Sequence, residues 1–342
     1  MAIFVTGGAG FIGSQFIRDT VVQNPDELVI NFDALTYAGN LENLAPVDHL
    51  PNYRMVKGDI CSDADVLAAI PDGCSAVVNF AAESHVDRSI LSATEFVKTN
   101  VLGTQTLLDI ARHKKVGRFV HISTDEVGGS MEPNQWFSED MPLNPSSPYA
   151  ASKTAAEHLV RAAHHTFGLD TVITRTSNNY GPYQFPEKLL PLAISNALHG
   201  RNIPVYGDGL QERDWIHVAD NTRALGIVLR RGRSGQTYHI GGRNPLKNLD
   251  VLKILLKAVG QPESLLTHVT DRLGHDRRYA IDCSKILAEL GWEPEIPFEE
   301  GLASTIKWYQ DNQKWVERTR SGEYKEYYRR MYGETSADTT NA

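Results

Sequence analysis

A glycine-rich turn near the amino terminus limits the possible fold of this chain more than any other feature. The apolar run Ala2–Thr6 predicts a buried strand, and Gly7, Gly10 and Gly13 follow it at once, spaced three residues apart. Apolar residues at helical spacing then continue to about Gln23. In a strand–turn–helix of this kind the glycines let the backbone approach a diphosphate, which the helix N-terminus attracts. A glycine triplet alone is weak evidence, but this context predicts a dinucleotide site.

An acidic residue ends the second predicted strand. Residues 28–32 are apolar except for Asn31, and Asp33 follows them about twenty residues after the last glycine of the turn. An aspartate there accepts hydrogen bonds from the adenosine ribose hydroxyls and repels a 2′-phosphate, so it favours NAD over NADP as the cofactor. The alternative is that Asp33 is an ordinary turn residue.

Strands and helices alternate through the rest of the first half of the chain. Further strands are predicted at 54–57, 76–82, 118–122 and 171–174, and helices at 94–114 and 149–167. This alternation predicts an α/β fold with a doubly wound parallel sheet. After residue 174 the sequence becomes polar and loop-rich, and 216–230 is typical of a strand and helix that return to the first unit. We therefore expect a cofactor domain at 1–177 plus about 216–241, a smaller, discontinuous substrate domain at 178–215 plus 242–330, and a disordered tail at 336–342.

Composition narrows the class of partner. At 342 residues the chain exceeds one typical core, so one large domain or two unequal ones is expected. A net charge of -8 argues against nucleic acid as a main partner, although local arginines can still bind an anionic substrate. The sequence has no long apolar run of a membrane helix and no basic leader. Cys61, Cys74 and Cys283 are scattered without metal-ligand spacing, so we expect a cytoplasmic protein without a metal or a membrane partner.

A hydroxyl and two carboxylates follow the predicted strand at 118–122. Thr124, Asp125 and Glu126 come directly after Ser123, and ligands bind at the carboxyl ends of strands in open α/β sheets. Taken alone, such a trio is more often a helix cap or a solvated turn. Together with the glycine turn and the Tyr/Lys pair described next, it indicates redox chemistry coupled to proton transfer.

Tyr149 and Lys153 are four residues apart and share one face of the helix predicted at 149–167. An ammonium beside a phenol lowers the pKa of the phenol, so Tyr149 would act as a base near neutral pH. Such a base removes the proton of an alcohol while NAD accepts the hydride from the same carbon. Such a pair is common on helices. It supports a catalytic role only because the glycine turn occurs in the same chain.

The two carboxyl groups permit a second step. Oxidation of a carbinol to a ketone acidifies the neighbouring C–H, which a carboxylate can deprotonate. A carboxylic acid can then protonate a hydroxyl one carbon further along, so that water leaves and the hydride can return. Two carboxyl groups in one site tend to have split pKa values, one suited to a base and one to an acid. Thr124 would hold the oxygen of the oxidised carbon.

At these motifs the chain resembles the extended short-chain dehydrogenase/reductases, and within them the dTDP-glucose 4,6-dehydratase family. The resemblance extends from about residue 2 to residue 309 and is carried by segments 6–13, 33–40, 81–88, 123–127, 178–183 and 272–278. The glycine turn and the Tyr/Lys pair mark only the superfamily, whereas Thr124, Asp125 and Glu126 are more specific to the dehydratases. The resemblance implies a Rossmann-type fold and NAD-dependent conversion of a nucleotide glucose to its 4-keto-6-deoxy form.

The resemblance also implies roles for individual residues. Tyr149 becomes the oxidation base, Asp125 the acid toward the 6-hydroxyl and Glu126 the base at C5. Matching cofactor positions are Gly7, Gly10, Phe11, Ile12, Gly13, Asp33, Thr36, Asp59, Ile60, Ala81, Thr99, Tyr149, Lys153 and Asn179. Matching substrate positions are Ser84, Thr124, Asn178, Lys188, Leu189, Pro204, Tyr206, Arg213, Asn248, Arg272 and His275. The guanidinium groups of Arg213 and Arg272 suit a diphosphate, and their alternative is a surface or interdomain ion pair.

One position departs from the family pattern. Family members usually carry a tyrosine where this chain has Gly128, and the missing aromatic predicts free space and a freer backbone beside the carboxylates. This departure bears on rate and substrate choice more than on the type of reaction.

Two alternative functions are also compatible with some of these residues. An epimerase or decarboxylase of the superfamily would share the oxidation but would not need the Thr–Asp–Glu trio, and a non-catalytic NAD sensor would be expected to lack Tyr149 or Lys153.

The helices at 94–114 and 149–167 carry more small and apolar positions than burial against one sheet requires. In the family such helices pair across subunits, so a homodimer joined by a four-helix bundle is expected.

Overall fold

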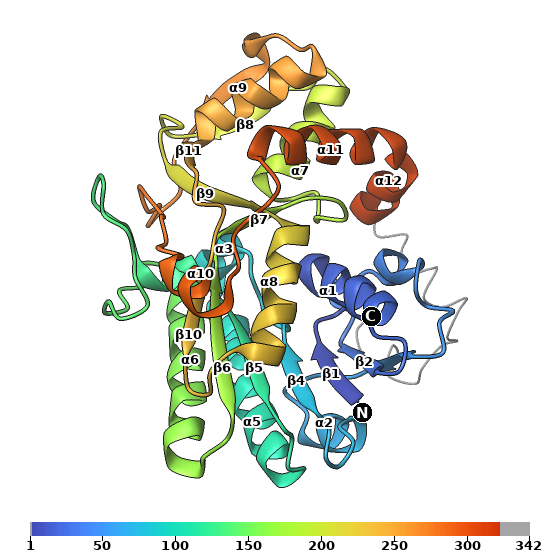
Figure 1. Ribbon diagram of the computed structural model, residues 1–342. Coiled ribbons are helices and arrows are strands. Elements are labelled where there is room, and N and C mark those ends of the chain that lie inside the picture. Colours follow the sequence, from blue (N-terminus) through green and yellow to red (C-terminus); the bar gives the residue numbers. More distant parts are fainter. Residues whose placement is uncertain (1, 322–342) are drawn as a thin grey trace.

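The computed structural model describes residues 2–321, and their side chains as far as residue 319. Its larger part is a seven-stranded sheet in which every neighbouring pair of strands is parallel (Figure 1). The strands in sheet order are β10 (Thr237–Ile240), β6 (Thr171–Thr176), β5 (Phe119–Thr124), β4 (Ala76–Asn79), β1 (Ala2–Thr6), β2 (Leu28–Asp33) and β3 (Tyr53–Lys57). The chain order reverses between β1 and β4, so the predicted doubly wound, Rossmann-type α/β fold is confirmed.

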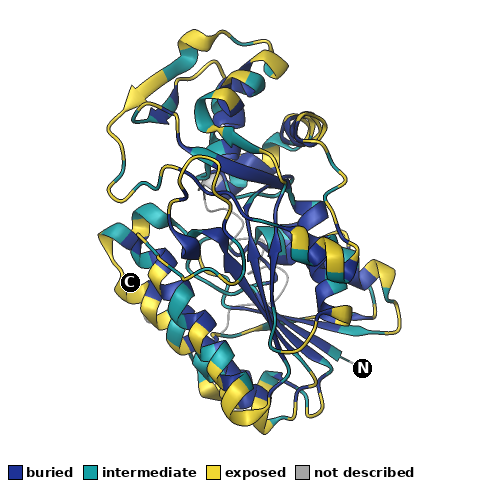
Figure 2. Ribbon diagram, turned by 60° about the vertical axis from the view of Figure 1, so that its left-hand side comes forward, coloured by how far each residue is buried: buried dark blue, intermediate teal, exposed yellow. Residues whose placement is uncertain are grey.

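Helices cover both faces of this sheet. One face is packed by α1 (Phe11–Gln23), α8 (Val218–Arg231) and α10 (Ser284–Leu290), and the other by α2 (Asp63–Ala69), α5 (Thr104–His113) and α6 (Pro148–Phe167). Each face has its own apolar cluster, so the strands between them are buried on both sides (Figure 2). Within residues 2–321, no helix combines the length and the apolar character needed to cross a membrane.

A smaller unit lies beyond the carboxyl edge of the large sheet (Figure 1). It contains the sheet β11 (Pro245–Lys247), β9 (Glu212–His217), β7 (Asn178–Tyr180) and the pair β12 (Leu266–Val269), β8 (Ile203–Tyr206). Its helices are α7 (Leu189–Leu198), α9 (Asn248–Val259), α11 (Phe298–Asp311) and α12 (Gln313–Ser321), packed round a third apolar cluster. Short elements lie between these helices and strands, among them η1 (Leu41–Leu44), α3 (Val86–Leu91), η3 (Asp125–Gly128) and η4 (Glu263–Leu265).

The limits of the two predicted domains remain a prediction. The smaller sheet includes β9, which begins at Glu212, whereas the sequence pattern predicted a strand from residue 216. Residues 322–330 of the predicted substrate domain and the predicted tail at 336–342 lie outside the described residues.

Two predicted elements differ in the structure. The strand expected at 76–82 ends at Asn79, and beyond it the Phe80 N–H donates to the Thr6 carbonyl oxygen and the Ala81 N–H to the Thr6 hydroxyl oxygen. The helix expected at 94–114 is three consecutive pieces: α4 (Thr94–Phe96), the π-helical segment η2 (Val97–Gly103) and α5. A π-helical segment is an unusual element that often occurs at functional sites.

The longest helix, α6, is fixed at both ends by its own sequence. Ser147 accepts a hydrogen bond from the Ala150 N–H at 3.1 Å, and Pro148 occupies the first turn, where its missing N–H costs little. Gly168, in the left-handed conformation at φ 67°, ends the helix. These caps fix the position of α6 relative to β5. The first two turns of α6 carry the Tyr/Lys pair.

Candidate active site

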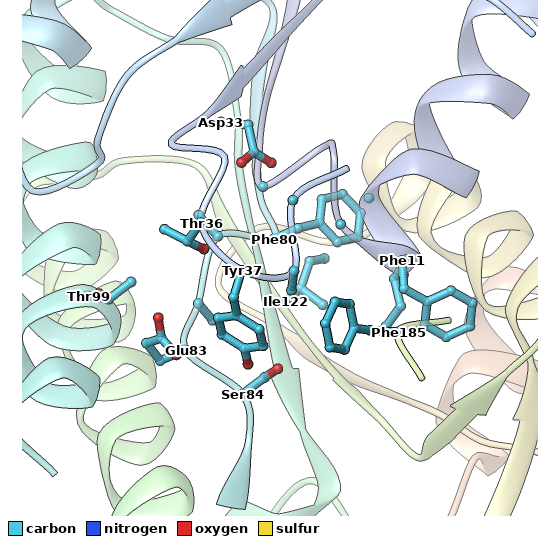
Figure 3. Close-up of a pocket in the computed structure, with 18 of the residues that line it drawn as sticks. Phe11, Asp33, Thr36, Tyr37, Phe80, Glu83, Ser84, Thr99, Ile122 and Phe185 are labelled. Atoms are coloured by element: carbon cyan, nitrogen blue, oxygen red, sulfur yellow. The ribbon is translucent and has the colours of Figure 1, made fainter. Parts of the chain in front are cut away.

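One cavity of about 450 Å³ opens at the carboxyl ends of the central strands, where the order of β1 and β4 reverses. Every residue that the sequence predicted to bind cofactor lines this cavity. Figure 3 shows Phe11, Asp33, Thr36, Thr99 and Ile122 around it. The structure therefore brings these residues, from strand ends that are far apart in the chain, to one cavity.

The glycine turn is shaped by close backbone contacts. Gly7 has φ +67°, and a Cβ atom there would lie 2.6 Å from the Ala81 backbone nitrogen. A Cβ at Gly13 would lie 2.4 Å from the Gly7 carbonyl oxygen. The N-cap residue of α1, Gly10, has no side chain to bond the first N–H groups of that helix. The close approaches explain why the turn requires glycine at these positions, and the uncapped N-terminus of α1 beside it suits the diphosphate of a dinucleotide.

Asp33 links this turn to the end of β2. Its carboxylate accepts hydrogen bonds from the Ala9 N–H at 2.9 Å and the Leu35 N–H at 2.8 Å. Burial raises the pKa of Asp33, and these two bonds oppose the shift. The carboxylate lines the cavity and also organises the local turn, so both interpretations offered by the sequence describe part of its environment.

The carboxylate pair lies on the short turn η3, directly after β5. Thr124 caps the turn by accepting a bond from the Glu126 N–H at 3.2 Å, and its hydroxyl donates to Asp125 Oδ1 at 3.1 Å. Asp125 is only 4% exposed, and its Oδ2 atom has no hydrogen-bond partner among the described residues. The trio is therefore a helix cap, as its sequence suggested, and also part of the cavity wall.

The two carboxyl groups experience different electrostatics. Burial, and then the negative charge of Glu126, raises the pKa of Asp125 to about 8. Burial also raises the pKa of Glu126, but the charges of Arg213 and Lys188 oppose that shift. Near neutral pH this arrangement favours a protonated Asp125, which is the state expected of an acid.

The expectation that Lys153 lowers the pKa of Tyr149 is wrong for this structure. Burial and the negative charge of Glu126 raise the pKa of the phenol, which is hydrogen-bonded with Thr124. The ammonium of Lys153 instead donates to the Ile122 carbonyl oxygen at 2.6 Å, and burial lowers its own pKa to about 8. Tyr149 and Lys153 lie on the same wall of the cavity, as their spacing predicts. The spacing does not show which group the Lys153 ammonium binds.

The predicted substrate residues divide into two groups. Thr124, Ser84, Asn178 and Lys188 line the cavity, and Lys188 donates from Nζ to the Ser84 carbonyl oxygen at 2.9 Å. The cavity lining does not include Leu189, Pro204, Tyr206, Arg213, Asn248, Arg272 and His275, which belong to the smaller unit and its loops.

Part of this second group forms a cluster of its own. The Arg272 guanidinium lies 5.0 Å from the centre of the Tyr206 ring, and the His275 ring is 6.3 Å from that ring. Arg272 forms an ion pair with Asp87 at 3.2 Å, which is the alternative that the sequence left open for it. Arg213 donates to the backbone carbonyl of Asp276 at 2.9 Å.

The sequence analysis missed several residues of the cavity wall. Tyr37 lies between Glu83 and Ser84 on one side and Phe185 on the other (Figure 3), with the guanidinium of Arg88 3.8 Å from its ring centre. Tyr37 lies inside the quoted segment 33–40, so that motif could have indicated it.

The last described helix also reaches the cavity. Trp315 and Thr319 of α12 line its wall, and the Trp315 indole N–H donates to Asn43 Oδ1 at 3.1 Å. These partners are 272 residues apart in sequence, and no local pattern predicts such a contact.

Comparison with known proteins decides the family. The family model described as GDP-mannose 4,6 dehydratase matches residues 4–305. A dTDP-glucose 4,6-dehydratase of Streptomyces niveus is 51% identical over 325 residues, which cover 94% of this chain and 96% of that protein. The crystal structure of a dTDP-glucose 4,6-dehydratase from Streptomyces venezuelae with NAD bound has a TM-score of 0.91 and 50% identity, covering 93% of this chain and 100% of that chain. The chain belongs to the dTDP-glucose 4,6-dehydratase family.

More distant solved structures share the fold with other activities. A UDP-glucose 4-epimerase from Thermus thermophilus, in complex with NAD, has a TM-score of 0.84 and 28% identity, covering 91% of this chain and 100% of that chain. The resemblance inferred from the motifs is thus confirmed at the level of the dehydratase family as well as the superfamily.

The departure from the family pattern at Gly128 does not leave a void. The ring of Phe137, which is 1% exposed, fills the space where a side chain at 128 would begin. The expectation of free space and a freer backbone beside the carboxylates is therefore wrong, because a residue nine positions later supplies an aromatic ring.

The raised pKa of Asp125 gives a stability prediction that is independent of any substrate. The folded protein keeps the Asp125 proton up to a pH of about 8, whereas the unfolded chain loses it near 3.8, so this group makes the fold less stable as pH rises through that window. Asp125→Asn removes the titrating group, so the variant should gain melting temperature relative to the parent between pH 5 and pH 8, a range set by these two pKa values. Thermal unfolding of both proteins across this range measures the difference, and a difference independent of pH would contradict the raised pKa.

Proposed function

We propose that this protein dehydrates a nucleoside-diphosphate glucose, dTDP-glucose, to the 4-keto-6-deoxy sugar, using NAD as a regenerated cofactor. The reaction consists of oxidation at C4, loss of water across C5–C6 and return of the hydride to C6. The observation that carries this proposal is the Thr124–Asp125–Glu126 turn in the same cavity wall as Tyr149 and Lys153. The identity with dTDP-glucose 4,6-dehydratases over nearly the whole chain supports the choice of substrate.

The glycine turn and Asp33 would hold the cofactor. The uncapped N-terminus of α1 behind the glycine turn suits the diphosphate, and the Asp33 carboxylate suits the adenosine ribose. When bound, NAD would supply an acceptor for the C4 hydride from which the hydride can return to C6. The hydride leaves and returns within one turnover, so the protein must keep the reduced cofactor until the end of the reaction.

The protein's own side chains would move the protons. Tyr149 would accept the proton of the C4 hydroxyl, which requires that its buried phenol be ionised first, and the positive charge of bound NAD would favour that ionisation. Thr124, which is hydrogen-bonded with the phenol, would hold the C4 oxygen. Glu126 then takes the C5 proton, which the new ketone has made acidic. Asp125, whose raised pKa keeps it protonated near neutral pH, donates its proton to the departing 6-hydroxyl.

Ser84, Asn178 and Lys188 are positioned to contact the nucleotide sugar, since each lines the cavity close to this turn. Arg213 and Arg272 carry positive charge that reaches Glu126, and we assign them to the substrate diphosphate. In that role the Arg272 guanidinium exchanges its ion pair with Asp87 for phosphate oxygens.

The carboxylate turn also separates this function from its alternatives. A 4-epimerase needs oxidation and reduction at C4 alone, so it has no use for a protonated carboxyl group beside the base. A non-catalytic NAD sensor does not require Tyr149 and Lys153, which are both present on the cavity wall.

Three substitutions test the proposed division of labour. With dTDP-glucose, Glu126→Gln should form enzyme-bound NADH but no 4-keto-6-deoxy product, and Asp125→Asn should slow water loss while retaining some solvent hydrogen exchange at C5. Tyr149→Phe should suppress NADH, exchange and product together, because oxidation comes first. Losses of roughly 10²- to 10⁴-fold are typical of general acid–base groups. NADH absorbance, C5 exchange and the alkaline absorbance of the product report the three steps, and normal turnover in both carboxylate variants would refute the mechanism.

We also propose that the protein is a homodimer joined by a four-helix bundle formed by the helical run 94–114 and by α6 of each subunit. The segments η2 and α5 of this run both pack against α6, and Leu102 on η2 and Phe167 on α6 are 58% and 53% exposed. Arg112 covers the Phe167 ring at 4.2 Å, next to a shallow hollow between the two helices. An isologous contact between copies would cover this apolar surface.

The dimer predicts a mass of about twice the 38.0 kDa of one chain in sedimentation equilibrium. Phe167→Asp, which places a charge on this surface, should shift the equilibrium toward monomer, whereas the same change at the exposed Leu273 in the smaller unit should not. A single 38.0 kDa species at all concentrations of the parent protein would contradict the proposal.

A further inference from the structure

The last described helix, α12, is anchored in the core of the smaller unit. Trp315 and Val316 are buried in the apolar cluster of that unit. The Trp315 ring lies 5.1 Å from the ring of Trp308 on α11 and 5.8 Å from the ring of Tyr183. These contacts fix one face of α12 to the smaller unit.

The polar side chains of α12 bind the cofactor domain instead. Trp315 Nε1 donates to Asn43 Oδ1 at 3.1 Å, and Thr319 Oγ1 accepts a hydrogen bond from Asn40 Nδ2 at 3.4 Å. All four residues are buried, and all four line the cavity. The helix therefore forms part of the cavity wall where the smaller unit meets η1 and the amino-terminal segment (Figure 1).

The segment that α12 binds also holds the glycine turn. Asn43 Nδ2 donates to the Ala9 carbonyl oxygen at 3.0 Å, and the Asn40 N–H donates to the same oxygen at 3.0 Å. The Ala9 N–H in turn donates to the Asp33 carboxylate at 2.9 Å. A chain of hydrogen bonds thus connects α12, through η1, with the glycine turn and with the carboxylate that ends β2.

An ion pair joins α12 to η1 outside the cavity. Arg318 Nε lies 3.0 Å from Oε1 and 3.2 Å from Oε2 of Glu42, and Arg318 Nη2 also donates to Glu42 Oε2. The Glu42 side chain is only 12% exposed. Arg318 and Glu42 are not among the residues that line the cavity. A change in either can therefore affect a bound cofactor only through the position of α12 or through long-range charge.

We propose that α12 is part of the cofactor site and acts as a clasp: Trp315 and Thr319 cover the cavity beside the glycine turn, and the bonds from α12 to η1 retain the dinucleotide. NAD or NADH leaves at an appreciable rate only when α12 separates from η1. Retention matters because the hydride must return to the sugar before the reduced cofactor is lost. This last point rests on the proposed function, whereas the binding of the dinucleotide does not.

The test exchanges the charges of Glu42 and Arg318. Arg318→Glu and Glu42→Arg each replace the two-contact ion pair by repulsion, so each should raise the rate at which NADH leaves the protein by about tenfold. The double variant restores an ion pair of reversed polarity and should return the rate to within about threefold of the parent. The rate is measured without substrate, as the loss of bound-NADH fluorescence when excess NAD displaces NADH from the loaded protein.

The two single changes alter the local charge in opposite directions. A purely electrostatic effect on the anionic cofactor would speed NADH release in Arg318→Glu and slow it in Glu42→Arg, and that result would overturn the clasp. An unchanged rate in both folded single variants would also overturn it, as would a double variant without recovery.

The exposed ion pair Lys307–Asp311 of α11 provides a matched control in the same unit. Its Nζ–Oδ2 distance is 2.9 Å, and neither residue is among those that line the cavity. Lys307→Glu should leave the rate of NADH release unchanged. A tenfold increase in this control would overturn the assignment to α12.

Trp315→Phe is a milder variant for the case that a charge reversal does not yield folded protein. It keeps an aromatic ring in the core of the smaller unit but removes the N–H that binds Asn43. NADH release should become about three- to tenfold faster, which corresponds to the loss of one hydrogen bond. A parental rate in this variant would overturn the role of the Trp315–Asn43 contact.

A second readout connects retention with the reaction. During turnover of dTDP-glucose, Trp315→Phe and Arg318→Glu should lose part of their cofactor as free NADH, and added NAD should restore product formation. Turnover without any free NADH in both variants would overturn the role of the clasp in the reaction. Failure of the proposed function would look different, because the parent would give no 4-keto-6-deoxy product while the displacement rates would still report on α12.

Discussion

The burial of two neighbouring carboxyl groups at the end of one parallel strand is the constraint on which the site depends. Water would ionise both groups, but the cavity wall removes it from Asp125, and the charge of Glu126 next to it further favours the protonated form. Positive charges from Arg213 and Lys188 act on Glu126 from the smaller unit. The large sheet therefore buries the pair, and the smaller unit supplies the cations that oppose the effect of this burial.

The rest of the architecture fixes the pair in place. Thr124 caps the turn, and Lys153 reaches across from α6 to the Ile122 carbonyl oxygen of β5. Behind the turn, the Phe137 ring separates it from the buried Arg175–Glu157 ion pair. Breaking such a buried pair by removing one partner is typically costly, at about 3–5 kcal/mol. Buried contacts of this kind keep the short 3₁₀ turn in place. The turn can therefore hold its two carboxyl groups close together, although in water they would move apart.

Much of this could be predicted from the sequence, because it depends on local patterns. Apolar runs defined the strands, and the convergence of parallel strand ends brought Gly7, Asp33, Thr124 and Tyr149 to one cavity, as expected. Contacts between distant segments could not be predicted in this way. No local signal places Phe137 against Gly128 or Trp315 against Asn43, and the missing tyrosine at 128 therefore indicated a space that the structure fills. The hydrogen bond of Lys153 was also not predicted, because the spacing of residues on a helix does not show which carbonyl oxygen an ammonium group binds.

The central claim is that one cavity oxidises C4, eliminates water across C5–C6 and returns the same hydride to C6. The most direct test is a turnover of dTDP-glucose carrying deuterium at C4, followed by NMR of the product. The account predicts deuterium at C6, transferred within the molecule through the cofactor, and a hydrogen from solvent at C5. Deuterium that remains at C4, as in an epimerase, or that appears in free NADH would contradict it.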